Sequence, residues 1–368
     1  MSKVSRKKHV LLLQETLVPY RFPIYNIIAK HFDFSVAFLY KAKGCEKQTA
    51  NFELIQFESF SIKGVHWIRN LKSLCKHFDA VITLPHLRCL NFCTVPFRYQ
   101  RSFAALTWSI GVRASYNRAF SIKEKLKWSD YIYERIMKEC EANIFYTQVP
   151  IEKWVKRGLD RNKFFVAHNT VEVYPIEYSP NNRNSILFVG TLYPQKGTDL
   201  LIKAYASAKD LCKSDDFPIL EIVGDGTQKE ELKSFVNSLG INDSVRFYGG
   251  IFDEFTLSQI FSKAIICISP RQAGLSVLKS MGYGVPYVTQ EDAITGGEIF
   301  NIKNGENGVI YDSPDRLSDI IYDAYVNISK YKIMGKAAYD YYHRYSTPQI
   351  MADGVIAAVE YALLKKSK

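Results

Sequence analysis

The chain has 368 residues, of which 47% are hydrophobic and 23% charged. This balance is typical of a folded globular protein with room for two domains, and it excludes an intrinsically disordered chain. No apolar run approaches the roughly 20 residues that span a bilayer. The apolar segment after the basic N-terminus, 10–13, is also shorter than the core of a signal peptide, so we expect it to be the first buried strand.

The formal net charge of +11 is concentrated in the first half of the chain. Residues 1–180 contain 28 Lys and Arg against 15 Asp and Glu, and the remainder contains 20 against 22. This asymmetry predicts an anionic partner for the first half, such as a membrane surface; a solvated face that favours solubility is the alternative. We expect no nucleic-acid partner, because the cations are dispersed and no recognition motif is present.

Seven scattered cysteines, an odd number, favour free thiols in a reducing compartment over a disulfide framework. Cys89 and Cys93 have no second Cys/His pair at zinc spacing, so we expect no metal site. Together these features predict a cytoplasmic protein, at the inner face of the cytoplasmic membrane.

In the first half, short apolar segments alternate with amphipathic ones. The apolar segments lack polar alternation, which predicts strands buried on both faces, and their alternation with helices predicts a parallel α/β sheet. The expected strands are 9–13, 34–39, 80–84, 103–108, 143–146 and 164–167. The expected helices are 22–31, 66–77, 122–140 and 150–157.

An aperiodic segment with two prolines and three asparagines, 172–184, predicts an interdomain linker, after which the alternation resumes. Two doubly wound sheets would then face a cleft at the carboxyl ends of their strands. The expected strands are 185–189, 219–223, 244–248, 264–268 and 286–289. The expected helices are 198–208, 228–239, 254–261, 275–282, 314–329 and 347–364.

Residues 264–289 carry the strongest signal for a ligand. A buried strand reaches a Ser-Pro break, a short helix follows, and a Gly-Val-Pro turn leads into another strand. A helix that begins at the end of a parallel strand offers its amide groups to an anion. Arg271 and Lys279 bracket the start of this helix, so the segment predicts a phosphate site.

Two earlier strand-to-helix turns carry related signals. Lys196 precedes the helix 198–208, where an ammonium can reach phosphate oxygens; a surface lysine is the alternative. Gly224-Asp225-Gly226 follows the strand 219–223 and predicts either a nucleotide-base pocket or a tight turn. It is not a dinucleotide fingerprint, because Lys229 stands where the third glycine belongs.

Taken in order, these motifs resemble family 4 of the retaining glycosyltransferases, which have the GT-B fold. The resemblance covers most of residues 185–310, and 168–173 is similar to the segment that precedes the family's linker. It rests on Gly190, Lys196-Gly197, Ile222 to Gly226, Val245, Phe247, Gly249, Ser269-Pro270 and Gly284-Val285-Pro286.

The resemblance implies an α/β fold with two Rossmann-like doubly wound domains. It places an acceptor-binding domain in residues 1–177, a nucleotide-sugar-binding domain in 178–346, and in 347–368 a C-terminal helix that returns to the N-terminal domain. Within that fold we expect catalytic roles for Lys196 and Arg271, as cations that stabilise the charge of the leaving group. The donor-binding residues that we expect are Gly190, Thr191, Gly224, Asp225, Gly226, Gly274, Leu275, Ser276, Lys279 and Glu298.

The chain departs from the family pattern at three charged positions. The family carries two glutamates eight positions apart, and here those positions are Arg271 and Lys279. Thr191 stands directly after Gly190, at the position where the family has an arginine. We therefore expect the positive charge that the family has at the position of Thr191 to be supplied here by the residues that bracket the helix 275–282. We expect Glu298 to replace a lost ribose or sugar contact; a surface turn is the alternative for Glu298.

The N-terminal half resembles the family only loosely. A Pro-Tyr-Arg loop after the first strand predicts that Tyr20 and Arg21 face the cleft. The segment 107–114, where the family's histidine is expected, holds none, which leaves His86 and His168 as alternatives.

The resemblance implies transfer of a sugar, with retention, from a UDP- or GDP-linked donor to a glycan acceptor. The implied acceptor is lipid-linked and the pathway is cell-surface polysaccharide or lipopolysaccharide assembly. The nucleotide sugar is a substrate, and we expect no cofactor. A non-catalytic nucleotide-sugar-binding protein and a GT-B nucleotide-sugar epimerase are the alternatives.

Overall fold

The computed structural model describes residues 6–86, 88–97, 100–113, 127–212, 214 and 216–367. The chain divides into two compact units. The described residues of the first unit lie within 1–112, 121–169 and 348–368, and nearly all of those of the second lie within 170–347. Each unit contains one large parallel sheet.

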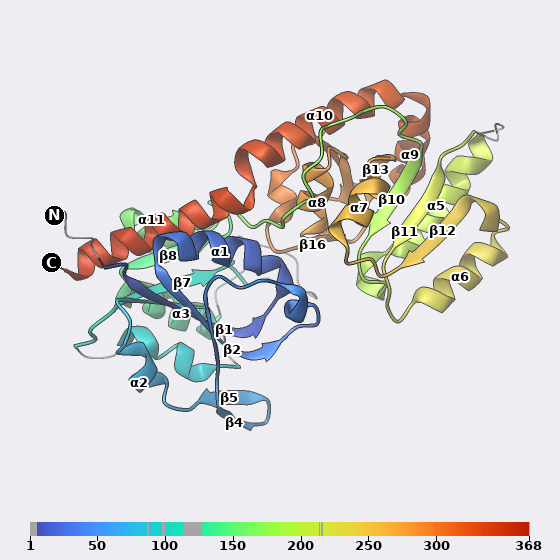
Figure 1. Cartoon of the computed structure of the whole chain (residues 1–368). Helices are drawn as coiled ribbons and strands as arrows, with labels where there is room; N and C mark the ends of the chain where they lie inside the picture. Colours follow the sequence, from blue (N-terminus) through green and yellow to red (C-terminus); the bar gives the residue numbers. More distant parts are fainter. Residues whose placement is uncertain are drawn as a thin grey trace. The chain divides into compact units, whose positions relative to one another are not determined.

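The sheet of the first unit has seven parallel strands in the order β3-β2-β1-β6-β7-β8-β9. Strands β1, β2, β7 and β8 are labelled in Figure 1. The chain winds outward in both directions from the neighbouring strands β1 and β6, which makes the sheet doubly wound with a switch point between them. The strands are β1 (His9–Leu17), β2 (Asp33–Lys41), β3 (Glu53–Gln56), β6 (Ala80–Thr83), β7 (Ala104–Ser109), β8 (Ala142–Phe145) and β9 (Phe164–Val166).

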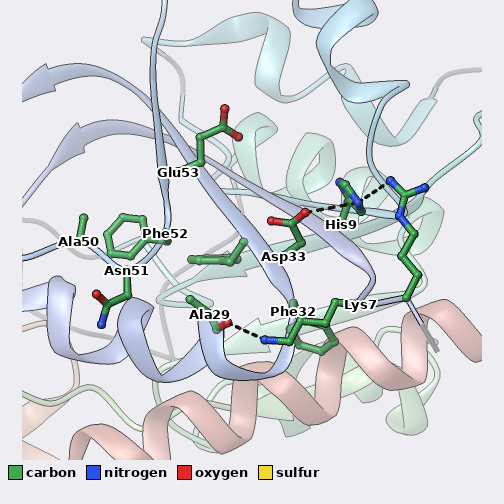
Figure 2. A pocket seen from close by; sticks show the side chains of 11 residues that line it. Lys7, His9, Ala29, Phe32, Asp33, Ala50, Asn51, Phe52 and Glu53 are labelled. Atoms are coloured by element: carbon green, nitrogen blue, oxygen red, sulfur yellow. Dashed lines mark hydrogen bonds and ion pairs between the residues drawn. The ribbon is translucent and has the colours of Figure 1, made fainter. Parts of the chain in front are cut away.

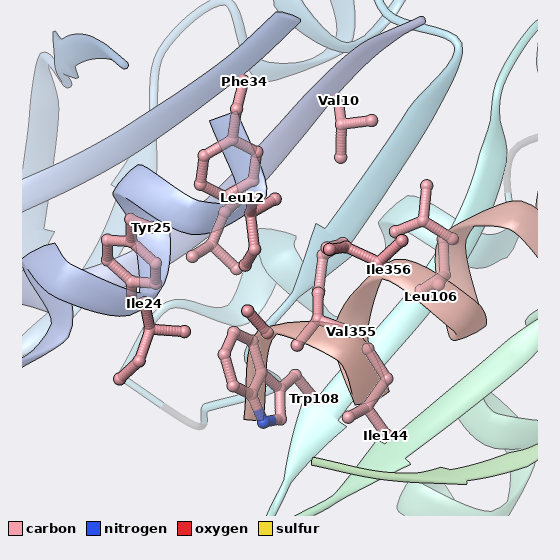
Figure 3. Close-up of a cluster of buried hydrophobic side chains, with 14 of the residues drawn as sticks. Val10, Leu12, Ile24, Tyr25, Phe34, Leu106, Trp108, Ile144, Val355 and Ile356 are labelled. Atoms are coloured by element: carbon pink, nitrogen blue, oxygen red, sulfur yellow. The ribbon is translucent and has the colours of Figure 1, made fainter. Parts of the chain in front are cut away.

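Both faces of this sheet are covered. On β1, Val10 and Leu12 belong to a core shared with α1 (Phe22–His31) and α11 (Pro348–Lys366), as Figure 3 shows. Leu11 of the same strand faces a second core with α2 (Leu71–Cys75) and α3 (Trp128–Glu139). Burial on both faces is the reason that the strand lacks polar alternation.

The C-terminal helix α11 belongs to the first unit, as the predicted fold class requires. It packs against α1 and strands β7, β8 and β9. A Cβ on Gly354 would lie 2.2 Å from the carbonyl oxygen of Val166, so only glycine permits this approach of helix to strand. The helix therefore completes a core whose other members come from the first 170 residues.

The sheet of the second unit has six parallel strands in the order β12-β11-β10-β13-β15-β17. Its switch point lies between β10 and β13, and separate cores cover its two faces. The strands are β10 (Ser185–Val189), β11 (Ile219–Val223), β12 (Val245–Gly249), β13 (Ala264–Ile268), β15 (Tyr287–Gln290) and β17 (Gly308–Tyr311). The helices are α5 (Thr198–Leu211), α6 (Lys229–Ser238), α7 (Glu254–Phe261), α8 (Ser276–Gly282), α9 (Arg316–Val326) and α10 (Ile328–Tyr345).

Two predicted helices are wrong in part. The segment 66–77 contains a strand, β5 (Val65–Ile68), before the short helix α2; the strand pairs with β4 (Ser59–Ile62). Its aromatic and β-branched residues favour a strand. The predicted helix 314–329 is broken at Asn327, and the separate helix α10 follows. Part of the predicted helix 122–140 lies outside the described residues, and the described part contains α3.

The two ends of the second unit lie side by side. The Oγ1 atom of Thr170 donates a hydrogen bond to the carbonyl oxygen of Ser346, which directly precedes the last residue of this unit. Among the described helices of the chain, none is long and apolar enough to cross a bilayer.

Candidate functional site

Lys196 and Arg271 meet at the switch point of the second sheet. Lys196 ends the short 3-10 helix Pro194–Lys196 that follows β10, and Arg271 follows β13. The backbone N–H of Arg271 donates to the carbonyl oxygen of Lys196 at 3.3 Å. A Cβ on Gly197 would lie only 3.0 Å from Cγ of Arg271, so the arginine stem packs directly on this glycine. The two loops therefore place both cations where ligands of doubly wound sheets bind.

Lys196 is a buried cation. Its side chain lies over Gly190, where a Cβ would come within 3.3 Å of Nζ, and the residue is 8% exposed. Burial lowers the pKa of the ammonium to about 8. Among the described residues Lys196 Nζ has no hydrogen bond or ion pair; it lies 6.0 Å from the centre of the Tyr193 ring. A buried charge without a bonded counter-ion is unfavourable unless a ligand compensates it.

Glu298 places a negative charge near this lysine. The carboxylate is 6% exposed and accepts hydrogen bonds from the Gly296 amide at 2.8 Å and from Oγ1 of Thr295 at 3.1 Å. Its charge raises the pKa of Lys196, which opposes the larger effect of burial. Glu298 is therefore held by its own loop, close enough to act on Lys196 electrostatically.

Arg271 is exposed, in contrast to Lys196. Its guanidinium forms no ion pair or side-chain hydrogen bond with any residue that the structure describes. The other position at this loop edge, Thr191, is also exposed and carries no charge. Arg271 is therefore the more accessible of the two cations that could reach an anionic ligand.

The glycines after β11 allow two loops to touch through their backbones. A Cβ on Gly224 would lie 1.8 Å from the carbonyl oxygen of Gly190, and one on Gly226 would lie 2.2 Å from that of Leu192. Between them, Asp225 is exposed, accepts from the Gly226 amide, and lies 3.2 Å from the Lys229 ammonium. These hydrogen bonds lower the pKa of the Asp225 carboxyl.

The segment after Arg271 begins a short helix. Leu275 precedes the seven residues of α8, and Gly274, Leu275 and Ser276 are half-buried. The hydroxyls of Ser276 and Tyr287 share a hydrogen bond of 2.8 Å. The tyrosine hydroxyl is also 3.2 Å from the carbonyl oxygen of Gln272, so Ser276 is tied to the underlying strand.

Lys279 does not join the pair formed by Lys196 and Arg271. Its ammonium is hydrogen-bonded to the carboxylate of Glu254, at the start of α7, and this carboxylate also accepts from the hydroxyl of Tyr283 at 3.0 Å. Sequence reasoning missed Glu254, because nothing in its local pattern links it to a lysine 25 positions later. The pair neutralises the charge of Lys279 within the second unit.

The structure buries Arg21 inside the first unit. Its guanidinium donates to the Asn169 side chain at 2.8 Å and lies 5.2–5.7 Å from the ring centres of Tyr20, Trp108 and Tyr146. Tyr20 is 37% exposed, whereas Arg21 is 6% exposed. These contacts hold Arg21 within its own unit, and its ligand role remains a prediction.

Of the two candidate histidines, His86 lies beside charged groups. It follows β6, and its Nδ1 is 3.2 Å from the carboxylate of Glu15 in β1, which Arg88 approaches at 3.7 Å. This group lies at the switch point of the first sheet, where β1 and β6 are neighbours. His168 is half-buried, and burial lowers its pKa.

A cavity of about 430 Å³ opens elsewhere in the first unit, at the amino ends of β1 and β2 (Figure 2). Lys7 donates to the carbonyl oxygen of Lys30 at 2.8 Å, and His9 lies 3.3 Å from Asp33. Because ligands of doubly wound sheets bind at the carboxyl ends of the strands, we do not assign the donor site to this cavity.

Comparison with known sequences identifies the second unit. Residues 174–341 match the family Glycosyl transferases group 1. A Haemophilus influenzae protein named as an uncharacterized glycosyltransferase is 28% identical over 151 residues, which are 40% of this chain and 41% of the relative. A GDP-mannose-dependent phosphatidylinositol monomannoside mannosyltransferase of Mycobacterium tuberculosis is 28% identical over 199 residues, which are 50% of this chain and 49% of the relative. The chain thus spans less than half the length of these relatives.

Solved structures match nearly the whole chain. Anabaena HepE, crystallised with UDP and glucose, superposes with a TM-score of 0.68 at 14% identity, covering 96% of this chain and 99% of HepE. WaaG, a glycosyltransferase of lipopolysaccharide biosynthesis, gives a TM-score of 0.62 at 17% identity, covering 94% and 98%. At these identities the likeness shows the fold alone. Residues 174–341 therefore match the group 1 glycosyltransferase family, and the chain has the GT-B fold.

Proposed function

We propose that this protein is a glycosyltransferase that moves a sugar, with retention, from a UDP- or GDP-linked donor to a glycan acceptor. The group 1 domain supports the reaction class. HepE was crystallised with UDP-glucose, and the mycobacterial relative is named as GDP-mannose-dependent, which supports a nucleotide sugar as donor. The names of the lipopolysaccharide enzymes WaaG and WaaB support an acceptor in cell-surface glycan assembly, and a lipid-linked acceptor is part of the proposal.

The observation that carries the proposal is the pairing of buried Lys196 with exposed Arg271 at the switch point of the second sheet. In the proposed reaction the bond between the anomeric carbon and the diphosphate oxygen breaks. The acceptor oxygen bonds to the same face of that carbon, and its proton passes to the departing phosphate. The negative charge that develops on the leaving group is the charge that these two cations would stabilise.

The remaining residues would serve to position the donor. In this proposal the turn Gly224-Asp225-Gly226 lies near the nucleotide base, and the amides of 274–276 lie near the diphosphate. Glu298 would contact a sugar or ribose hydroxyl, because a carboxylate accepts hydrogen bonds that neither Arg271 nor Lys279 can accept. The donor is a substrate in this scheme, which invokes no additional cofactor.

Titration calorimetry with UDP and with GDP tests the site. We expect Lys196→Ala to weaken binding of the cognate diphosphate at least about tenfold, the loss of one charge-assisted contact. Lys203→Ala, an exposed lysine of α5, is the matched control and should bind as the wild type does. Undiminished diphosphate binding by Lys196→Ala would contradict the role proposed for Lys196.

An assay for product formation distinguishes a glycosyltransferase from a protein that only binds nucleotide sugars. The charge reversal relative to the family at Arg271 and Lys279 is the observation that favours a non-catalytic nucleotide-sugar-binding protein as the second candidate. A panel of donors incubated with acceptor extracts should yield a glycosylated product. Tight donor binding with no product from any donor would favour the second candidate.

A further inference from the structure

A short hairpin of the first unit stands apart from the seven-stranded sheet (Figure 1). Strands β4 and β5 are antiparallel and are joined by Lys63-Gly64, whose φ angles of 50° and 77° are both positive. A two-residue connection of this kind matches the natural twist of a hairpin and fixes its register. The register in turn decides which side chains share a face.

One face of this hairpin is apolar and exposed. Phe60 lies opposite Trp67, and Ile62 lies opposite Val65, so the four side chains project from the same face. They are exposed by 47%, 47%, 67% and 36%, respectively. We call these four residues the hairpin face. A contiguous apolar patch of this kind marks a surface that is covered in function.

The hairpin is held so that this face stays outward. Its other face carries Ile68, which is buried, and His66, whose Nε2 is 3.2 Å from the hydroxyl of Tyr40. The side chain of Asn91 exchanges hydrogen bonds with the backbone N–H and C=O of Ile68. These contacts attach the face with His66 and Ile68 to the rest of the first unit, so the opposite, apolar face of the hairpin points to solvent.

Exposed cations lie next to the hairpin in the sequence. Residues 58–76 contain four basic residues and one acidic residue, Glu58. Lys63 at the tip, and Arg69, Lys72 and Lys76 after β5, are all exposed. Aromatic side chains beside lysines are typical of a protein surface that lies in the headgroup region of a bilayer. Protein interfaces, in contrast, are depleted in lysine.

We propose that the hairpin face docks on an anionic lipid bilayer, with Phe60 and Trp67 in the interfacial region and the flanking cations on the phosphate headgroups. The role of this contact rests on the proposed function, because an enzyme with a lipid-linked acceptor has to reach that acceptor at a membrane. The lipid contact itself requires no transferase activity, and it can therefore be tested separately.

Sedimentation with lipid vesicles tests the contact. The full chain should bind vesicles of phosphatidylcholine mixed with phosphatidylglycerol and bind phosphatidylcholine alone more weakly. Phe60→Ser/Trp67→Ser should lower the partition coefficient on the mixed vesicles at least about tenfold. Phe252→Ser/Ile333→Ser, which removes two exposed apolar side chains from the second unit, is the matched control and should bind as the wild type does.

A second readout needs no change in the hairpin face. In a Trp128→Phe background, Trp67 is the only exposed tryptophan that remains, since Trp108 and Trp154 are buried. Its fluorescence should be quenched by brominated phosphatidylcholine in anionic vesicles. Unchanged fluorescence would overturn the proposal.

Three further outcomes decide the inference. Equal vesicle binding by Phe60→Ser/Trp67→Ser and by the wild type would overturn it. If the wild type is a dimer and the double variant is a monomer, a second copy of the chain covers the hairpin face. This result would also overturn the proposal. Unchanged UDP binding by the double variant, together with lost vesicle binding, would support it; failure of the wild type to bind any nucleotide would contradict the proposed function alone.

Discussion

Replacing Lys196 by Met should stabilise the protein while weakening donor binding. Burial lowers the pKa of this lysine from 10.5 to about 8 in the folded state. Such a difference between the folded and unfolded states corresponds to roughly 3 kcal/mol of unfavourable free energy when the side chain is charged. Methionine keeps an apolar, unbranched side chain of similar length and removes the buried charge. We therefore expect the free energy of unfolding at pH 7 to rise by about 1–3 kcal/mol.

The gain should depend on pH in a defined direction. Below a pH of about 8, Lys196 is protonated in both states, so the wild type carries the full penalty of the buried charge. Between about 8 and 10.5 the folded protein releases this proton and the unfolded chain retains it, so the penalty shrinks as the pH rises. The stability advantage of Lys196→Met should therefore be largest at neutral pH and disappear through this range.

Urea denaturation of the two proteins at a series of pH values measures this difference. The exposed lysine of α5 provides the control, since Lys203→Met should change stability by less than about 0.5 kcal/mol at every pH. UDP titrations on the same samples should show wild-type affinity falling as the pH rises through about 8, whereas Lys196→Met should show weaker affinity without that step. A Lys196→Met protein that is less stable than the wild type at pH 7, or a stability difference that is constant with pH, would refute the reasoning.

Three further predictions concern the second unit. Arg271→Ala should weaken UDP binding at least about fivefold, measured by calorimetry, with little change in unfolding free energy because the guanidinium is exposed; equal affinity would remove it from the site. Gly224→Ala should lower the free energy of unfolding by about 2–4 kcal/mol, since its Cβ would collide with a backbone carbonyl. Gly240 is the control, because its backbone has φ +66° but nothing lies within 4 Å of the position of a Cβ. Gly240→Ala should lower the free energy of unfolding by only about 1 kcal/mol in the same denaturation assay. Equal losses for Gly224→Ala and Gly240→Ala would contradict the steric argument. A double-mutant cycle of Lys279→Met and Glu254→Gln should give a coupling energy of about 1 kcal/mol by thermal unfolding, and additive effects would show that the pair contributes nothing.

Much of the fold could be predicted from the sequence because its central strands are buried on both faces. The apolar segments 185–189, 219–223 and 264–268 coincide with β10, β11 and β13. Their residues contact helices above and below, so hydrophobicity alone defines them. The elements that were missed follow other patterns: the hairpin of β4 and β5 is apolar on its exposed face, and α10 buries mainly tyrosine, glycine and alanine.

The candidate site could be predicted only where neighbouring residues in the sequence form it. The loops that contain Lys196 and Arg271 were recognisable from their glycine and proline pattern, and the sheet topology brings the two loops together. The partner of Lys279 was not recognisable, because Glu254 reaches it through the packing of α7 beside α8. A contact between residues far apart in the chain cannot be inferred from the local sequence. The burial of Arg21 could not be predicted for the same reason.

The position of α11 has a consequence for the order of folding during synthesis. The second unit is inserted in the first, and its ends adjoin at Thr170 and Ser346. Its sequence is complete at residue 347, whereas the core of the first unit still lacks Met351, Val355 and Val359 at that point. The first unit therefore completes its folding after the second unit, once α11 has left the ribosome. A chain that stops after residue 347 should contain a folded second unit attached to a first unit with an open core.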